Sequence, residues 1–159
     1  MTSESPPIAF RSCLPTEEPG ASLIAAMGAE IGLIYDGLVI DAADMPKAGP
    51  AELSPPSGDV QVGERDGQPV CVGAIKRLDD EACEIKRMYV VPEARGEGLA
   101  AVLLARLEER ARELGYVIAR LDTGPRQPAA LSLYSRSGYE PIANFNRNPM
   151  ATFFGQKRL

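Results

Sequence analysis

Two glycines and an arginine open the most regular amphipathic segment of the sequence. Residues 90–115 read VVPEARGEGLAAVLLARLEERARELG, and Arg95, Gly96 and Gly98 occupy the turn before the helical pattern. Backbone N–H groups at a helix N-terminus lie at the positive end of a dipole worth about half a charge, so they bind phosphate where no side chain blocks them. Glycines clear that approach, and Arg95 adds a charge suited to phosphate contact. The turn therefore predicts an anion site, although a strand, a turn and a helix can also be purely architectural.

A dinucleotide-binding pattern competes for the same glycines. Residues 96–101, GEGLAA, fit G-x-G-x-x-G/A, and Asp122 lies about where a ribose-binding acid is expected. In that fold the glycine turn follows its strand immediately, whereas residues 92–95 intervene here. The strands before the turn are also predicted to form a meander rather than to alternate with helices. We therefore reject this interpretation, and the lack of GK followed by Ser or Thr excludes a P-loop.

Composition limits the possible partners. The 159 residues, with 45% hydrophobic and 25% charged, are typical of a single globular domain over 1–159. A net charge of -5 and a pI of about 4.9 argue against nucleic-acid binding, which requires a basic face. No apolar run approaches the roughly 18 residues of a membrane span, and the first residues do not resemble a signal peptide. We expect a cytoplasmic protein that does not enter a membrane.

The cysteine and histidine content limits the chemistry. Cys13, Cys71 and Cys83 are odd in number and show no C-x-x-C spacing, which favours free buried thiols over a disulfide framework. The sequence predicts no metal site. It contains no histidine, so any acid or base must be Glu, Asp, Tyr, Lys or a water molecule.

The hydrophobic pattern changes near residue 58. Before it we expect a short apolar segment at 8–10, a helix over 17–34 and a proline-rich loop over 45–59. After it, the spacing predicts three strands of an antiparallel meander at 59–66, 68–78 and 81–91. The rest predicts a helix over 98–114, a strand over 116–123, a helix over 127–138 and a closing strand over 152–159.

Two separated motifs, taken together, resemble the GNAT acetyltransferases. Arg95 to Ala100, after Val91 and Pro92, match Q/R-x-x-G-x-G/A. Residues 127–134, QPAALSLY, match N-x-x-A-x-x-L-Y, and Gly138 and Tyr139 follow as the family pattern requires. Gln127 stands where the family usually has asparagine. The resemblance covers 59–159 well and the first 58 residues loosely, where the family places a first strand and two variable helices.

The resemblance implies an α/β (α+β) fold with a mixed central sheet of about six to seven strands and helices on both faces. The strands would form an antiparallel meander followed by β-α-β-α-β. It also implies an acetyl-CoA site. The turn would hold the pyrophosphate through Arg95, Gly96, Glu97, Gly98, Leu99 and Ala100. The preceding strand would offer its backbone to the pantetheine arm through Met88, Tyr89, Val90 and Val91. Two further cofactor contacts would come from Gln127 and Tyr134.

Acetyl transfer to an amine requires a base and an acid. At pH 7 an alkylammonium with a pKa of about 10.4 is deprotonated in only about one molecule in two thousand. Glu84 is the candidate base, because some GNAT members place a catalytic glutamate on this strand; alternatively, it pairs with a neighbouring Lys or Arg. Tyr134 is the candidate acid for the leaving thiolate, and packing in the core is its alternative role. Cys83 has no histidine to activate it, which favours direct transfer in a ternary complex.

The acceptor is predicted from fewer residues. Arg126 and Arg147 flank segments that approach the acceptor side in related folds, so they could bind a carboxylate or phosphate, or be solvated surface charges. Asn144, Asn146 and Asn148 could form turns or make polar contacts. We expect acetyl transfer from acetyl-CoA to the primary amine of a small molecule, by a monomer or homodimer. An N-terminal or lysine protein acetyltransferase and a catalytically inactive acyl-CoA-binding module are the alternatives.

Overall fold

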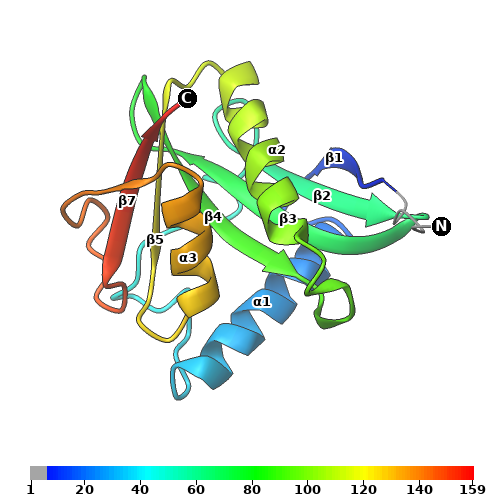
Figure 1. The fold of residues 1–159 in the computed structure, drawn as a ribbon, viewed down its shortest axis with the longest axis horizontal. Coiled ribbons are helices and arrows are strands. Elements are labelled where there is room, and N and C mark those ends of the chain that lie inside the picture. The colour runs from blue at the N-terminus through cyan, green and yellow to red at the C-terminus, as the bar shows by residue number, and fades with distance from the viewer. Residues whose placement is uncertain (1–6) are drawn as a thin grey trace.

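The computed structural model describes residues 7–159, which form a mixed sheet with helices on both faces (Figure 1). Its strands are β1 (Ala9–Cys13), β2 (Asp59–Arg65), β3 (Gln68–Arg77), β4 (Ala82–Val90), β5 (Ile118–Thr123), β6 (Glu140–Pro141) and β7 (Phe153–Arg158). Its helices are α1 (Gly20–Ile34), α2 (Leu99–Glu113) and α3 (Pro128–Arg136), with a 3₁₀ turn at Pro92–Ala94. Within the described residues, none of these helices has the length and hydropathy needed to cross a membrane.

The strand order is β1-β2-β3-β4-β5-β7-β6. The first four strands form the predicted antiparallel meander, and the β2–β3 turn uses Asp66 and Gly67 with φ of 51° and 75°. β4 and β5 are parallel, and their pairing ends at Glu84 and Arg120. Beyond this point β4 continues to Val90 while β5 turns away, so the two strands diverge (Figure 1). This split leaves one edge of the second half of β4 without a neighbouring strand.

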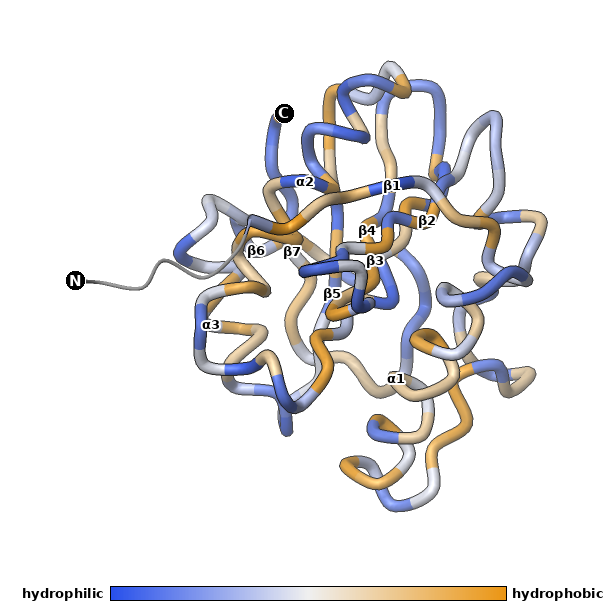
Figure 2. The backbone as a smooth tube through the Cα atoms, turned by 90° about the vertical axis from the view of Figure 1, so that its right-hand side faces the viewer, coloured by the Kyte–Doolittle hydropathy of each residue, from blue (hydrophilic) through white to orange (hydrophobic). Residues whose placement is uncertain are grey.

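A hydrophobic core lies on each face of the sheet. On one face α2 buries Leu103 and Leu107 against β3, where a Cβ on Gly73 would collide with Leu107. On the other face α1 contributes Leu23, which packs with Leu53 from the loop before β2. Figure 2 shows the hydrophobic segments gathered in the central strands and along parts of α1. Burial on both faces explains why β3 reads as a nearly continuous apolar run.

Three local features differ from the sequence prediction. The first helix begins at Gly20 rather than at 17, because Pro19 occupies its N-cap position. Residues 35–58 form turns and loop, as predicted for 45–59, and the second variable helix that the family places before the meander is not formed there; prolines at 46, 50, 55 and 56 disfavour a helix in the second half of this segment. The two-residue strand β6 was not predicted, because Glu140–Pro141 is too short to show a periodic pattern.

Candidate active site

The turn between the 3₁₀ segment and α2 has the backbone geometry that an anion site requires. Gly96 and Gly98 have φ of 83° and 77°, in the left-handed region that favours glycine, and open space surrounds the position of a Cβ on either residue. Gly98 caps α2, no side chain bonds to the cap, and the first turn carries no acidic residue. The N–H of Val102 bonds to the carbonyl of Gly98 (3.4 Å), so the amides before Val102 precede the helical hydrogen-bond ladder.

The two charged side chains of this turn bind neighbouring elements. Glu97 forms an ion pair with Arg65 at the end of β2, with an N···O distance of 2.7 Å. Arg95 forms one with Glu30 of α1 (2.7 Å), and its Nε donates to the carbonyl of Val90 (2.9 Å). The backbone amides are therefore the groups of the turn that remain available to an anion.

A cleft of about 140 Å³ opens where β4 and β5 diverge. Its walls come from the second half of β4, the end of β5, α1, α3 and the loop before β7. Among the predicted site residues, Met88, Gln127 and Tyr134 line it. The polar lining residues include Lys86, Arg87, Asp122, Thr123, Gln127 and Asn148.

Tyr134 projects from α3 toward β4. Its hydroxyl oxygen lies 3.9 Å from the sulfur of Met88, and its ring packs at 6.1 Å from the ring of Tyr139. Burial, and then the negative charge of Asp122, raise the pKa of Tyr134 above its ordinary value. The phenol is therefore protonated at neutral pH. This side chain is part of the core and also lines the cleft.

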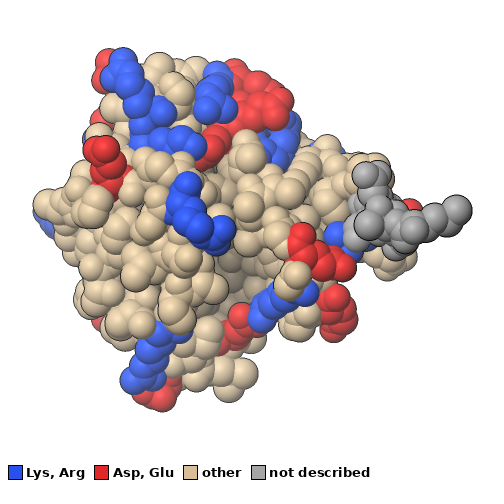
Figure 3. All heavy atoms as spheres, in the orientation of Figure 1, with Lys and Arg blue, Asp and Glu red and all other residues tan. Residues whose placement is uncertain are grey.

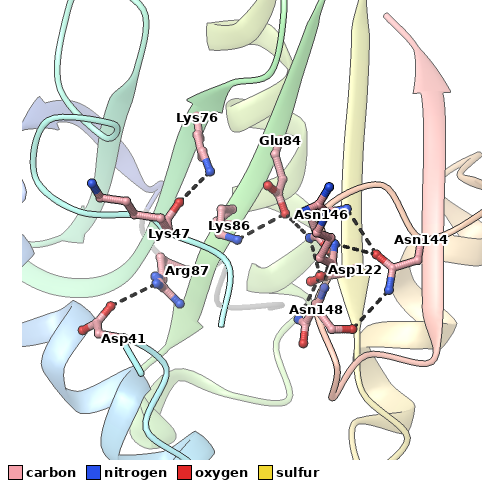
Figure 4. Close-up of polar contacts among 11 residues, drawn as sticks. Asp41, Lys47, Lys76, Glu84, Lys86, Arg87, Asp122, Asn144, Asn146 and Asn148 are labelled. Carbon is pink, nitrogen blue, oxygen red and sulfur yellow. Dashed lines mark hydrogen bonds and ion pairs between the residues drawn. The ribbon is translucent and has the colours of Figure 1, made fainter. Parts of the chain in front are cut away.

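Two carboxylates share one asparagine beside the cleft (Figure 4). The amide nitrogen of Asn146 donates to Glu84 Oε2 (2.8 Å) and to Asp122 Oδ2 (2.7 Å). Glu84 is fully buried and pairs with Lys86 at 3.2 Å, while its Oε1 has no partner in residues 7–159. Asp122 also accepts from Asn148 (3.0 Å) and lines the cleft, whereas Glu84 does not. The ion pair expected as the alternative role of Glu84 is thus present.

The loop before β7 is built by its asparagines. The side-chain oxygen of Asn144 accepts from the N–H groups of Asn146 (3.2 Å) and Arg147 (2.8 Å), and that of Asn146 accepts from the N–H of Asn148 (3.0 Å). Two of the three amides then reach the carboxylates of the cleft. The asparagines therefore form turns and make polar contacts at once. Arg147 has φ of 60° and an exposed side chain outside the cleft lining.

Arg126 and Gln127 lie at the start of α3 and contact the end of α1. Arg126 donates to the carbonyl of Ile34 and to Asp36, both at 2.9 Å, and is largely exposed. The side-chain oxygen of Gln127 accepts from the hydroxyl of Tyr35 (3.0 Å). Gln127 lines the cleft and Arg126 does not. Neither of the two predicted substrate arginines, Arg126 and Arg147, lines the cleft.

Among the lining residues that were not predicted as site residues, Asp122 and Arg87 bear most on the chemistry of the cleft. Asp122 had been considered only as a ribose ligand of the rejected dinucleotide fold, although its place at the carboxyl end of a parallel strand was a usable signal. Arg87 lines the cleft with φ of 58° at an irregularity of β4. No sequence signal marked Arg87, because the irregularity depends on how β3 and β4 pair.

Comparison with known proteins identifies the class. The model of the acetyltransferase (GNAT) family matches residues 39–139. The uncharacterized N-acetyltransferase YjgM of Escherichia coli K12 is 31% identical over 140 residues, which cover 86% of this chain and 83% of YjgM. IAA acetyltransferase of Azospirillum brasilense is 35% identical over 106 residues, covering 64% of this chain and 69% of that protein.

Solved structures of similar fold support the same family. A Klebsiella pneumoniae structure assigned as an acyl-CoA N-acyltransferase shares 29% identity, covers 96% of this chain and 97% of its own, and superimposes with a TM-score of 0.73. A GNAT acetyltransferase from Elizabethkingia anophelis, solved with acetyl-CoA bound, shares 17% identity and the fold, with a TM-score of 0.67 and coverage of 96% and 98%.

The chain belongs to the acetyltransferase (GNAT) family, as its two motifs predicted. It has the fold of that family and is by class an acetyl-CoA-dependent N-acetyltransferase. The family assignment confirms the expected fold and reaction class.

Proposed function

We propose that the chain transfers the acetyl group of acetyl-CoA directly to the primary amine of a small molecule in a ternary complex. The observation that carries this proposal is the cleft at the β4–β5 split, which is lined by both Tyr134 and Asp122. A proton donor and a proton acceptor in one small cleft match the two proton transfers that the reaction needs.

The cofactor would follow β4 from the cleft to the glycine turn. The amides of residues 96–100 and the N-terminal end of α2 would hold the pyrophosphate. The free edge of β4 beyond Glu84 offers backbone groups to the amides of the pantetheine arm. This path brings the thioester near Tyr134. The fold relatives from Elizabethkingia anophelis and Thermoplasma acidophilum hold acetyl-CoA and coenzyme A, respectively.

Asp122 is the residue that we assign to remove the proton from the acceptor ammonium. Two asparagine amides hold its Oδ2, and the residue borders the cleft. The free amine then attacks the thioester carbonyl carbon, and the tetrahedral intermediate collapses by breaking the C–S bond. Tyr134 protonates the departing sulfur, and the attacking nitrogen passes its remaining excess proton to the Tyr134 oxygen.

Glu84 would act through Asp122. It shares Asn146 with Asp122 and is paired with Lys86, so it orients the amide that holds the reacting carboxylate. A direct role as the base, alone or through a water molecule, is the rival assignment. Burial raises the pKa of the Cys83 thiol to about 12, so a thiolate nucleophile is disfavoured at neutral pH. This supports direct transfer over an acetyl-cysteine intermediate.

The experiment is a thiol-release assay with acetyl-CoA and a matched panel of small amines, peptides with free N-termini and lysine-containing peptides. We expect release with small amines and little with peptides. Binding of acetyl-CoA with no release from any acceptor would instead indicate an inactive acyl-CoA-binding module. Preferred release with peptides would indicate a protein acetyltransferase. The Tyr134→Phe variant run beside the wild type separates enzymatic release from background hydrolysis.

A further inference from the structure

A backbone irregularity places an arginine inside the cleft. Along β4, Lys86 is opposite Ala74 and Tyr89 is opposite Val72, so two β4 residues, Arg87 and Met88, face the single residue between them on β3. This is a β-bulge, and Arg87 takes the left-handed φ of 58° in it. Such a conformation is costly for a residue other than glycine and tends to occur at functional sites.

The guanidinium of Arg87 is buried and only weakly paired. Its side chain is 10% exposed, and its one ion pair within residues 7–159 is a 3.4 Å contact from NH2 to Asp41, which is 75% exposed. Burial lowers the pKa of Arg87, against the raising effect of the carboxylates of Asp41, Glu84 and Asp122. Lys86, in contrast, is already paired with Glu84 at 3.2 Å. Of these two cations that line the cleft, Arg87 has the longer and more exposed ion pair, and its guanidinium carries five N–H groups.

Two cavities meet at Arg87. It lines the catalytic cleft and also a cavity of about 500 Å³ under the loop that carries Asp41. Figure 4 shows Arg87 directed toward Asp41 and away from the group formed by Glu84, Asn146 and Asp122. The carboxylate of Asp41 thus already contacts this guanidinium. Because the Asp41 side chain is exposed, a substrate carboxylate can displace it.

The cleft has opposite charges at separate points of its lining. Asp122 is a carboxylate next to the proton donor, and Arg87 is a cation on the α1 side of β4. Figure 3 shows both basic and acidic side chains on the face that it draws, so this face does not present a single sign of charge. The lining of the cleft, with one carboxylate and one guanidinium, is complementary to a substrate that carries an ammonium group at one end and an anion at the other.

We propose that the acceptor is an amino carboxylate, whose ammonium group meets Asp122 while its carboxylate displaces Asp41 from Arg87. This inference rests on the proposed function of the cleft, and it names the substrate class. A carboxylate is favoured over a phosphate because the group already held by Arg87 is a carboxylate, that of Asp41. A planar guanidinium binds a carboxylate through two parallel hydrogen bonds, which the single 3.4 Å contact to Asp41 does not provide.

The test compares amino acids with their carboxamides, which keep the amine and side chain and lose only the negative charge. We expect kcat/KM to favour the acid by about 10- to 100-fold, as loss of a charged hydrogen bond predicts. Arg87→Gln should abolish that preference. Asp41→Asn should raise kcat/KM for the acid several-fold, about threefold or more, because it frees Arg87. The exposed pair of Arg77 and Asp80 supplies matched controls, Arg77→Gln and Asp80→Asn, which should leave the preference unchanged.

Each outcome has one meaning. Equal turnover of acids and carboxamides by the wild type would overturn the inference while leaving acetyl transfer intact, whereas no turnover of any amine would overturn the proposed function itself. Preference for an amino phosphate over the matched carboxylate would overturn the substrate class. Should Arg87→Gln fail to fold by circular dichroism, Asp41→Asn carries the test, and an unchanged or lower kcat/KM for the acid in that variant would refute the role of Arg87. Calorimetry with N-acetyl amino acids and their amides gives the same comparison without turnover.

Discussion

Two buried polar clusters lie on this sheet, and they differ in how completely their groups are paired. In the first, Asp59 is 1% exposed and accepts hydrogen bonds from Ser12 (2.8 Å), Gln61 (2.7 Å) and Arg110 (2.7 Å). The oxygen of Gln61 in turn accepts from Arg106 (3.1 Å). This cluster joins β1 and β2 to α2, and none of its residues lines either cavity described above.

The second cluster, at the cleft, keeps unpaired and strained groups. Glu84 Oε1 is buried without a partner in the described chain, Arg87 has a left-handed backbone, and Asp122 borders the cavity. A fully paired network stabilises a fold, whereas buried unpaired atoms and backbone strain tend to occur where a protein binds or reacts. We therefore expect the Asp59 cluster to stabilise the fold and the residues at the cleft to bind or react with the substrate.

The largest effect is expected from Tyr134→Phe, which keeps the ring and removes the proton. The turnover number should fall by about 10²- to 10⁴-fold, with little change in acetyl-CoA affinity by calorimetry. Because the pKa of Tyr134 is raised, the wild-type enzyme should lose no activity through its ionisation between pH 7 and 10. A loss under about threefold would mean that Tyr134 only packs in the core.

Asp122→Asn should come next, with turnover reduced about 10²- to 10³-fold at neutral pH. The asparagine oxygen still accepts from Asn146 and Asn148, so the loop should keep its shape. The loss should shrink as pH approaches the pKa of the acceptor amine, because the amine then needs no base. A pH–rate profile checks this, and a loss that stays constant with pH would place proton removal elsewhere.

Gly98→Asp should weaken acetyl-CoA binding by about 10- to 100-fold, because it puts bulk and negative charge where a pyrophosphate is expected. Gly98→Asn is the matched control, since asparagine tolerates the φ of 77° and has the same size without the charge. Calorimetry should show a smaller loss for Gly98→Asn. Equal affinities for the two variants, with the fold intact, would argue against an anion at this turn.

Glu84→Gln should have the smallest effect, a loss of about tenfold or less that is uniform across pH, as expected for a residue that orients Asp122. The glutamine still accepts from Asn146. A loss concentrated at low pH that recovers at high pH would make Glu84 the base instead. The pH–rate profiles of the two variants therefore distinguish the roles of Asp122 and Glu84.

The sequence predicted the parts of the molecule whose signals are local. The pattern of apolar residues predicted the strands of residues 59–91, and apolar residues spaced three or four apart predicted α2. Gly96, Gly98 and Tyr134 lie in short motifs. The cleft cluster was predicted only in part. Asn146 lies 62 residues from Glu84 and 24 from Asp122, and no local pattern records that these three side chains meet.

The place of Arg87 in the cleft lining and the Asp59 cluster were not predicted, for a similar reason. The bulge at Arg87 depends on the register between β3 and β4, and a charged residue within a strand is ordinarily read as solvent-facing. The Asp59 cluster joins Ser12 to Arg110 through side chains of three elements. Such contacts depend on tertiary packing, which the periodicity of one element does not contain.

The most direct test measures the unfolding free energy and the activity per folded molecule for Asp59→Asn and Asp122→Asn side by side. We predict that Asp59→Asn lowers the unfolding free energy by about 2 to 3 kcal/mol and keeps near wild-type activity, since it removes the buried carboxylate that pairs with Arg110 at 2.7 Å and leaves that guanidinium only its 3.7 Å pair with Glu113. Asp122→Asn should change the unfolding free energy by less than about 1 kcal/mol and lose at least about a hundredfold in activity. Activity lost in Asp59→Asn, or kept in Asp122→Asn, would contradict the division between a stabilising cluster and a reactive one.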